Sequence, residues 1–146
     1  MTQPAMTAFV SARAATAYGR GSRPRADARM IVLLYDGAIG QLAQARAAIA
    51  AGAVEARWRH VRKATAIVDG LQGCLDHAAG REVAGLLDRF YDYVGMRLQQ
   101  IDVRNDASIC DELIARLGEM RASWSALGDA AAAPAAAPPS VALRPI

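Results

Sequence analysis

Few residues in this sequence have the types and spacing that catalysis or metal binding requires. His60 and His77 are isolated, and neither Cys74 nor Cys110 stands at zinc-site spacing from another ligand. Asp76 and His77 are adjacent, so they point to different faces of a helix. The sequence also lacks a glycine-rich phosphate loop and a Ser-His-Asp set in a recognisable context. We therefore expect no enzymatic activity, no metal and no cofactor.

Arginine is the other residue type that could bind a ligand, since Lys63 is the only lysine among the 17 basic residues. A helical bundle lined with inward-facing arginines can hold a small dianion. Here the arginines of the predicted helices mostly fall beside the apolar stripes, and Arg97, next to Leu98, is the best candidate for a half-buried one. The set comprises Arg57, Arg62, Arg89, Arg97, Arg104, Arg116 and Arg121.

A second group of arginines lies near the N-terminus. This cluster could attract an acidic partner, or it could belong to a solvated, flexible leader. The formal net charge of only +3 is weak evidence for nucleic-acid binding, so we expect none. The cluster is Arg13, Arg20, Arg23, Arg25 and Arg29.

The composition favours helices as the elements that position these residues. The chain has 146 residues, enough for one domain; 53% are hydrophobic but only 5% aromatic, and alanine dominates. No uncharged apolar run is long enough to span a membrane, and the N-terminus does not resemble a Sec-type signal peptide. We therefore expect a cytosolic protein without membrane insertion, with Cys74 and Cys110 as buried, reduced thiols.

Residues 81–106 form the stretch around which the chain is organised. Its apolar residues recur at alternating steps of three and four, which predicts an amphipathic helix. Leu86 and Tyr93 widen the stripe, so this helix can contact two neighbours. The stripe consists of Val83, Leu87, Phe90, Val94, Leu98 and Ile101.

Three further helices are predicted, over residues 28–51, 54–77 and 107–127. Asp27 and Asp106 are expected N-caps, and Gly52 and Gly128 are expected to end their helices. Ala78–Gly80 is expected to form the turn before the central helix. The predicted stripes are Ile31, Leu34, Ala38, Leu42, Ala45 and Ile49 in the first helix, Trp58, Val61, Thr65, Val68, Leu71 or Gln72, and Leu75 in the second, and Ile109, Leu113, Leu117, Met120, Trp124 and Leu127 in the last.

The sequence thus predicts an all-α protein, an antiparallel four-helix bundle over residues 28–128. Residues 1–27 are expected to form a flexible leader, short helical or extended, with Tyr18 as its best anchor. Residues 129–146, rich in alanine and proline, are expected to form a disordered tail. Gly37 and Gly40 permit close approach of a neighbouring helix. Apolar residues beside the stripes leave a groove in which another amphipathic helix can dock.

Several stretches of the sequence match the motifs of one known family. LLYDGAI at residues 33–39 is similar to an M-L-Y-D-G-A segment. KATAIVDGL at residues 63–71, with Leu75-Asp76, is similar to K-A-x-x-I-I-x-x-L…L-D. The third stretch runs from Glu82-Val83-Ala84 through residues 90–94 and 97–98 to residues 104–106, like a series of E-I-A, L-Y-D-Y-M, R-R-L and N-D. Residues 121–124 are similar to an R-x-x-W end. In this order and spacing, the stretches together resemble the flagellar secretion chaperone family FliS.

The resemblance implies a bundle that binds the C-terminal segment of flagellin in the cytosol. Family members keep this segment from polymerising and deliver it to the flagellar type III export gate, and the client lays helices into apolar grooves. An N-terminal Ala-Tyr of the family, here Ala17-Tyr18, plugs the groove until flagellin displaces it.

The chain departs from the family pattern in four places. Residues 25–28 (RADA) replace T-A-S-P, Gly80-Arg81 replaces G-G, Ile101-Asp102 replaces the A-N before the N-D motif, and the link from Tyr18 to Asp36 is a few residues shorter. Asp27 can still cap the helix in the first case.

The residues predicted to contact the client combine the resemblance with the apolar pattern. Tyr35 and Tyr93 are favoured because their hydroxyls suit the wet rim of a groove, and Arg97 is expected to pair with Asp36, Asp92 or a client carboxylate. The predicted set is Tyr18, Tyr35, Ile39, Ile67, Leu71, Leu87, Phe90, Tyr93, Arg97 and Leu98. For each apolar member, an ordinary core position is an equally valid interpretation. The alternative function is an interaction or regulatory module that binds a different amphipathic helix. The oligomeric state is left open.

Overall fold

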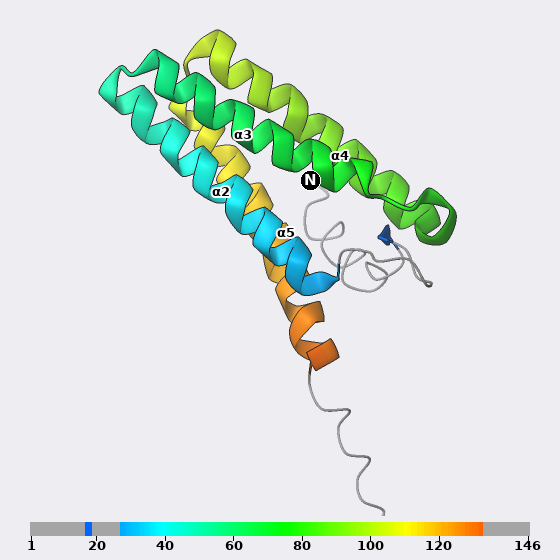
Figure 1. Cartoon of the computed structure of the whole chain (residues 1–146). Helices are drawn as coiled ribbons and strands as arrows, with labels where there is room; N and C mark the ends of the chain where they lie inside the picture. The colour runs from blue at the N-terminus through cyan, green and yellow to red at the C-terminus, as the bar shows by residue number, and fades with distance from the viewer. Residues whose placement is uncertain (1–16, 19–26, 133–146) are drawn as a thin grey trace, which may run out of the picture.

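The structure, a computed structural model, describes residues 17–18 and 27–132. It contains helices α2 (Ala28–Ala51), α3 (Val54–Gly73), α4 (His77–Arg104) and α5 (Ala107–Ala132), joined by short turns into a bundle (Figure 1). The prediction of an all-α four-helix bundle is confirmed. The rest of the predicted leader and residues 133–146 of the predicted tail lie outside the described residues.

The four helices pack unequally. Helix α2 packs extensively against both α3 and α5, whereas α4 and α5 share fewer backbone contacts than α3 and α4 do. Figure 1 shows α2 and α5 diverging from α3 and α4 toward the end where α2 begins. Among the described residues, no helix is both long and apolar enough to cross a membrane.

Helix α2 begins and ends as the sequence predicts. The Asp27 carboxylate accepts a hydrogen bond from the backbone N–H of Met30 at 2.9 Å, and Gly52 closes the helix at a φ of 69°. Gly37 permits the predicted close approach, because a Cβ there would lie 3.2 Å from Cδ1 of Ile67. The same prediction for Gly40 is wrong, since no atom lies within 4 Å of such a Cβ.

The boundary between α3 and α4 differs from the prediction. Helix α3 ends at Gly73, and Asp76 caps α4 by accepting a hydrogen bond from the Ala79 N–H at 2.9 Å. Residues 78–80, expected to be a turn, are therefore part of α4. The turn lies earlier than predicted, at residues 74–76, and the backbone leaves the helical conformation again at Arg81, inside α4.

Arg81 occupies a backbone conformation that only glycine adopts easily. Its φ of 47° and ψ of −117° lie outside the regions open to residues with a Cβ. The family pattern has glycine at this position. The kink in α4 is thus made by a strained residue.

Replacing Arg81 by glycine is expected to raise the free energy of unfolding by about 1 kcal/mol, because relief of the strain exceeds the entropy that glycine adds to the unfolded chain. Arg89→Gly is the matched control in the same helix. Arg89 is exposed and helical, so glycine there should lower stability by about 1 kcal/mol. Urea unfolding of both variants provides the measurement, and a stability loss in both would contradict the assignment of strain.

Helix α5 extends further than predicted. The Asp106 carboxylate accepts a hydrogen bond from the Ser108 N–H at 2.9 Å, as expected of a cap. The helix continues to Ala132, so the prediction that Gly128 ends it is wrong. Gly128 is buried, and a Cβ there would contact Cβ of Ala28 at 3.6 Å. Packing against the start of α2 therefore outweighs the low helix propensity of glycine.

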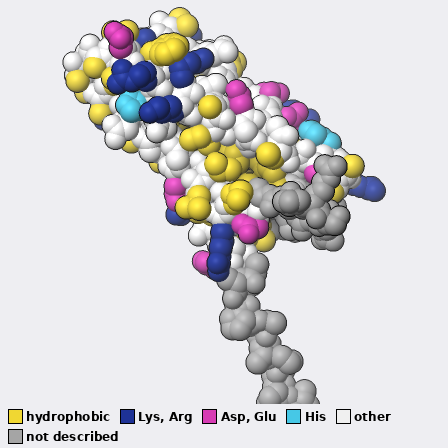
Figure 2. All heavy atoms as spheres, viewed as in Figure 1, with side chains coloured by type: hydrophobic (Ala, Val, Ile, Leu, Met, Phe, Trp, Pro, Cys, Tyr) yellow, Lys and Arg dark blue, Asp and Glu magenta, His cyan; other side chains and the backbone are white. Residues whose placement is uncertain are grey.

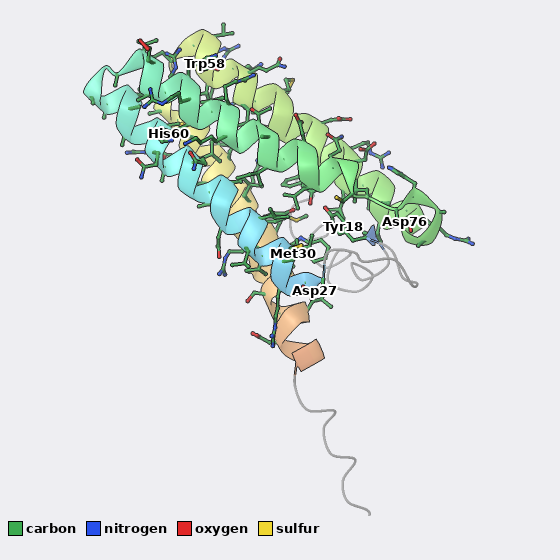
Figure 3. All side chains as sticks on the ribbon, in the orientation of Figure 1. Tyr18, Asp27, Met30, Trp58, His60 and Asp76 are labelled. Carbon is green, nitrogen blue, oxygen red and sulfur yellow. The ribbon has the colours of Figure 1, made fainter. Side chains whose placement is uncertain are left out.

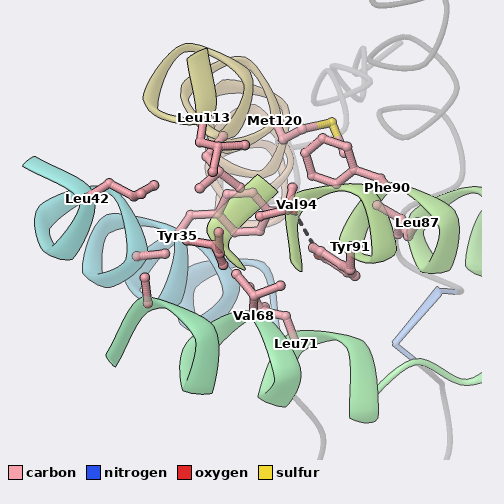
Figure 4. Close-up of a cluster of buried hydrophobic side chains, with 14 of the residues drawn as sticks. Tyr35, Leu42, Val68, Leu71, Leu87, Phe90, Tyr91, Val94, Leu113 and Met120 are labelled. Carbon is pink, nitrogen blue, oxygen red and sulfur yellow. Dashed lines mark hydrogen bonds between the residues drawn. The ribbon is translucent and has the colours of Figure 1, made fainter. Parts of the chain in front are cut away.

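The core is the cluster of buried side chains shown in part in Figure 4. The predicted stripe of α4 is buried throughout, and that of α5 is buried from Ile109 to Trp124 with Leu127 partly exposed. The stripe of α3 was mispredicted at its start. Trp58 is 54% exposed, and Arg57 is buried in its place at 9%. In α2, Tyr35 takes the core position predicted for Leu34.

The cysteines are both free. Cys110 is buried, as predicted, and burial raises the pKa of its thiol to about 11. Cys74 is exposed, contrary to prediction, because α3 ends before it.

Candidate functional site

A chain of three tyrosine hydroxyls joins the leader to the middle of the bundle. The hydroxyl of Tyr91 on α4 lies 2.8 Å from that of Tyr18 and 2.8 Å from that of Tyr35 on α2. The Tyr18 ring also meets Trp124 of α5 edge-on, with centroids 5.5 Å apart. All of these side chains are at most 5% exposed. We call Tyr18, Tyr35, Tyr91 and Trp124 the tyrosine cluster.

The tyrosine cluster is electrically neutral. Burial raises the pKa of Tyr35 to about 12, and burial likewise raises the pKa of Tyr18 and Tyr91 well above the ordinary value. All three phenols therefore stay protonated at neutral pH and act only as hydrogen-bond donors and acceptors. Such a cluster can hold an apolar segment that carries a polar tip.

The backbone also fixes Tyr18 in place. The carbonyl oxygen of Ala17 accepts a hydrogen bond from the N–H of Asp76 at 2.8 Å, directly before α4 begins. Figure 3 shows Tyr18 beside Asp76, at the end of the bundle where the two helix pairs diverge. The prediction that Tyr18 anchors the leader is confirmed by these contacts.

One polar atom of the tyrosine cluster makes no hydrogen bond of good geometry, although it lies near the Tyr35 phenol. Among the described residues, Nε1 of Trp124 is buried without a hydrogen bond. An unpaired buried donor is unfavourable.

A group of polar side chains joins α4 to α5, which share few backbone contacts. The Glu112 carboxylate of α5 accepts hydrogen bonds from Nε and Nη2 of Arg97 at 3.0 and 2.6 Å and from the Tyr93 hydroxyl. Arg116 adds an ion pair to Glu112 at 3.3 Å and lies over the Tyr93 ring. We call Tyr93, Arg97, Glu112 and Arg116 the α4–α5 clasp.

The expected pairing of Arg97 with Asp36 or Asp92 within the bundle is wrong. Asp36 binds Arg121 instead, and Asp92 accepts a hydrogen bond from Gln72. Arg97 points toward α5 because Glu112 lies beside it on that helix and accepts its hydrogen bonds. Sequence periodicity places a residue on a helix face but does not reveal which helix that face meets.

The clasp sets the protonation of Glu112. Partial burial alone would raise the pKa of this carboxyl, but the hydrogen bonds from Tyr93 and Arg97 and the charges of Arg97 and Arg116 together lower it. A group whose pKa is lowered by folding stabilises the folded state above its unfolded pKa. That stabilisation is lost as the pH falls through the folded pKa.

Glu112→Gln is therefore expected to lower the free energy of unfolding by about 1–2 kcal/mol at pH 7, because charge-assisted hydrogen bonds are lost at a partly exposed site. The difference from the wild type should shrink as the pH falls below the ordinary glutamate range near 4.5 and vanish at lower pH. Urea unfolding between pH 7 and 3 measures it. Glu119→Gln, at an exposed position of α5, is the control and should change stability by less than about 0.5 kcal/mol.

The predicted client-binding residues divide into two groups by exposure. Tyr35, Leu71, Leu87 and Leu98 are at most 1% exposed, and Tyr18 and Phe90 are 5% and 7% exposed. Ile39, Ile67, Tyr93 and Arg97 are partly exposed. The expectation that the Tyr35 hydroxyl lies at a wet rim is wrong, because that hydroxyl is buried against Tyr91. Tyr93 does lie at a partly exposed position.

Sequence reasoning missed part of the exposed apolar surface. Met30 and Leu33 of α2 are 52% and 69% exposed. A hollow of about 320 Å³ beside them is lined by Val32, Leu33 and Gly128, among others. Figure 2 shows hydrophobic side chains gathered over this part of the bundle. The available signal was that Met30 and Leu33 are large apolar residues off the predicted stripe of α2.

The sequence stretches that carry the family resemblance meet in space. Tyr35 binds Tyr91, Asp36 binds Arg121, and Tyr18 contacts Trp124. At the other end, Asn105 adopts a left-handed conformation at the end of α4 and Asp106 caps α5. The motif residues thus make contacts between helices at one end of the bundle and form the turn between α4 and α5 at the other.

Comparison with known proteins identifies the family that the chain resembles. The family model described as flagellar protein FliS matches residues 14–131. The flagellar secretion chaperone FliSB of Pseudomonas aeruginosa is 38% identical over 99 residues, 68% of this chain and 79% of the relative. The flagellar secretion chaperone FliS of Salmonella typhimurium is 37% identical over 66% of this chain and 72% of its own length. That of Vibrio cholerae is 29% identical, over 66% and 71%. The chain therefore belongs to the FliS family of flagellar secretion chaperones.

Proposed function

We propose that this protein binds the C-terminal segment of flagellin in the cytosol, prevents its premature polymerisation and delivers it to the flagellar type III export gate. The family assignment supports the flagellar client, and flagellin is the client that the motif resemblance implies. The observation that carries the proposal is the insertion of Tyr18 into the bundle. A residue outside the four helices occupies an apolar pocket with a polar end.

The pocket suits an amphipathic segment. Tyr18 enters where the helix pairs diverge, and its contacts combine a ring face with a hydroxyl. A client side chain of similar character can make the same contacts and can also use Nε1 of Trp124, which makes no hydrogen bond of good geometry. Client binding at this pocket therefore requires displacement of Tyr18.

The surface around the pocket can extend the contact. Met30 and Leu33 expose apolar area on α2, and Ile39 and Ile67 are partly exposed farther along. Tyr93 and Arg97 of the α4–α5 clasp are the remaining accessible members of the predicted set, and they border the seam between α4 and α5. Client helices laid on these surfaces would bury apolar area on two sides of the bundle. The buried members of the predicted set, such as Leu87 and Leu98, do not contact the client directly; they pack in the core beneath the binding surface.

The test is calorimetric titration of the full-length protein with the C-terminal peptide of a flagellin from the same organism. We expect one-to-one binding, micromolar or tighter, with a negative heat-capacity change from apolar burial. Leu33→Asp should weaken it at least about tenfold without unfolding the bundle, since Leu33 is exposed. Arg89→Asp, at an exposed site on α4, is the control. No binding by either the full-length protein or a chain lacking residues 1–24 would contradict flagellin as client and favour another amphipathic partner.

A further inference from the structure

The end of the bundle where α3 begins carries an exposed apolar group surrounded by cations. Trp58 and Val54 are 54% and 58% exposed. Arg59 is exposed on the same turn, and the guanidinium of Arg62 lies 5.9 Å from the centre of the Trp58 ring. Figure 2 shows Lys and Arg side chains gathered around a hydrophobic group at this end. We call Val54, Trp58, Arg59 and Arg62 the basic aromatic patch.

The patch contains a depression, and one of the residues that line it is held by hydrogen bonds to α4. A depression of about 400 Å³ is lined by Val54, Trp58 and Arg59, together with Glu55 and Arg57. Arg57 is fixed from beneath by hydrogen bonds to Asp102 at 3.2 Å and Asn105 at 2.7 Å. The hollow is large enough for one aromatic or branched aliphatic side chain.

The charges of the patch are only partly neutralised. Arg57 and Arg62 share the Asp102 carboxylate, Arg62 at a distance of 3.8 Å. Within the described part of the chain, Arg59 and Lys63 have no ion-pair partner. An electropositive rim around an apolar hollow is complementary to a carboxylate-bearing segment with an apolar anchor.

We infer that the basic aromatic patch is a second docking site, which binds an acidic protein segment through one inserted aromatic or aliphatic side chain. Trp58 forms the wall of the hollow, and Arg59 and Arg62 pair with carboxylates on either side of the anchor. Exposed tryptophan and arginine are the residue types that dominate binding energy at protein interfaces. The small extent of the patch, with one aromatic ring, favours a peptide over a nucleic-acid strand, which would need a longer basic track and several stacking rings.

The patch is separate from the tyrosine cluster. Trp58 stands near the start of α3, and Tyr18 lies at the other end of this helix, about 20 Å away at 1.5 Å per residue. A segment bound at the patch therefore leaves the Tyr18 pocket free. The protein can hold a client and a second, acidic partner at the same time.

The probe is a synthetic peptide in which one phenylalanine is flanked on each side by two aspartates, titrated into the full-length protein at low salt. We expect binding that weakens with added salt. Trp58→Ser and Arg59→Glu should each weaken it about tenfold or more. Leu33→Ser and Arg89→Glu are matched controls at exposed positions elsewhere and should leave it unchanged.

Two control peptides test the charge and the aromatic anchor separately. A peptide with lysine in place of aspartate, and one with alanine in place of phenylalanine, should both bind at least about tenfold more weakly. Equal affinity of the wild type and Trp58→Ser for the acidic peptide would overturn the inference, as would tighter binding of a single-stranded oligonucleotide than of the peptide. The flagellin-peptide affinity of Trp58→Ser should equal that of the wild type, so failure of this site and failure of the proposed function are separately visible.

Discussion

Replacing Arg57 by methionine is expected to lower the free energy of unfolding by about 2–3 kcal/mol, one of the largest losses from a single polar change in this protein. Methionine keeps most of the aliphatic volume but removes the hydrogen bonds to Asp102 and Asn105. The Arg57 side chain is only 11% exposed and that of Asp102 19%. The carboxylate would therefore be left half-buried without its main partner.

The loss should spread to the end of α4. Asn105 ends that helix at a φ of 50°, and its side chain is held by Arg57. Urea unfolding provides the measurement, and hydrogen exchange at residues 101–106 should show local opening in the variant.

Arg62→Met is the matched control, because Arg62 approaches the same carboxylate only at 3.8 Å and is 42% exposed. It should lower stability by less than about 1 kcal/mol. Asp102→Asn completes a double-mutant cycle with Arg57→Met. If the effects of the two changes add, the pair is not coupled and the structural role assigned to Arg57 is wrong.

Most of the fold could be predicted from the sequence because the helices of this chain bury regular stripes. The α4 and α5 stripes hold because each consists of large aliphatic or aromatic residues that recur at regular helical spacing. The caps Asp27 and Asp106 hold because side-chain capping depends only on local sequence. Helix caps and the period of the apolar residues were therefore sufficient to predict the four-helix architecture.

The errors arose where tertiary contacts overrule local preference. Gly128 has low helix propensity, yet it continues α5 because it packs against Ala28. Trp58 fits the apolar period of α3, but in the bundle Arg57 points inward instead. There it donates hydrogen bonds to Asp102 and Asn105 at the end of α4. A single sequence gives no indication of these partners, since they lie 45 and 48 residues away.

The candidate site was predictable only in part for the same reason. Tyr18 was identified as an anchor from its amphipathic character, and the structure gives it a place in the tyrosine cluster. Tyr35 was assigned to a rim because tyrosine commonly lies at one. Its burial depends on Tyr91, which is 56 residues away and supplies the hydroxyl that satisfies it.

Replacing Tyr18 by alanine is expected to raise the affinity for the flagellin C-terminal peptide by about tenfold, if the proposed client uses this pocket. Burying a tyrosine contributes roughly 1.5–3 kcal/mol, and the ordering of the leader offsets part of this. A net preference of about 1.4 kcal/mol keeps the pocket closed in roughly nine molecules of ten, which lowers the apparent affinity tenfold. Calorimetry with the peptide measures the change.

Tyr18→Phe separates the ring from the hydroxyl. It keeps the edge-on contact with Trp124 but loses the hydrogen bond to Tyr91, so its affinity gain should fall between those of the wild type and Tyr18→Ala. Weaker client binding by Tyr18→Ala would contradict displacement and would make Tyr18 part of the client-binding surface itself.

A second readout tests the plug without any client. In a Trp58→Phe background the remaining tryptophan is Trp124, which is 2% exposed beneath Tyr18. Tyr18→Ala should make its fluorescence more accessible to acrylamide and shift its emission to longer wavelength, and addition of the client peptide should reverse both changes. If Tyr18→Ala leaves quenching unchanged, Tyr18 does not cover Trp124 in solution and the pocket is open to clients without any displacement. If quenching rises but flagellin peptide does not reverse it, the plug is real and its competitor is a different amphipathic segment.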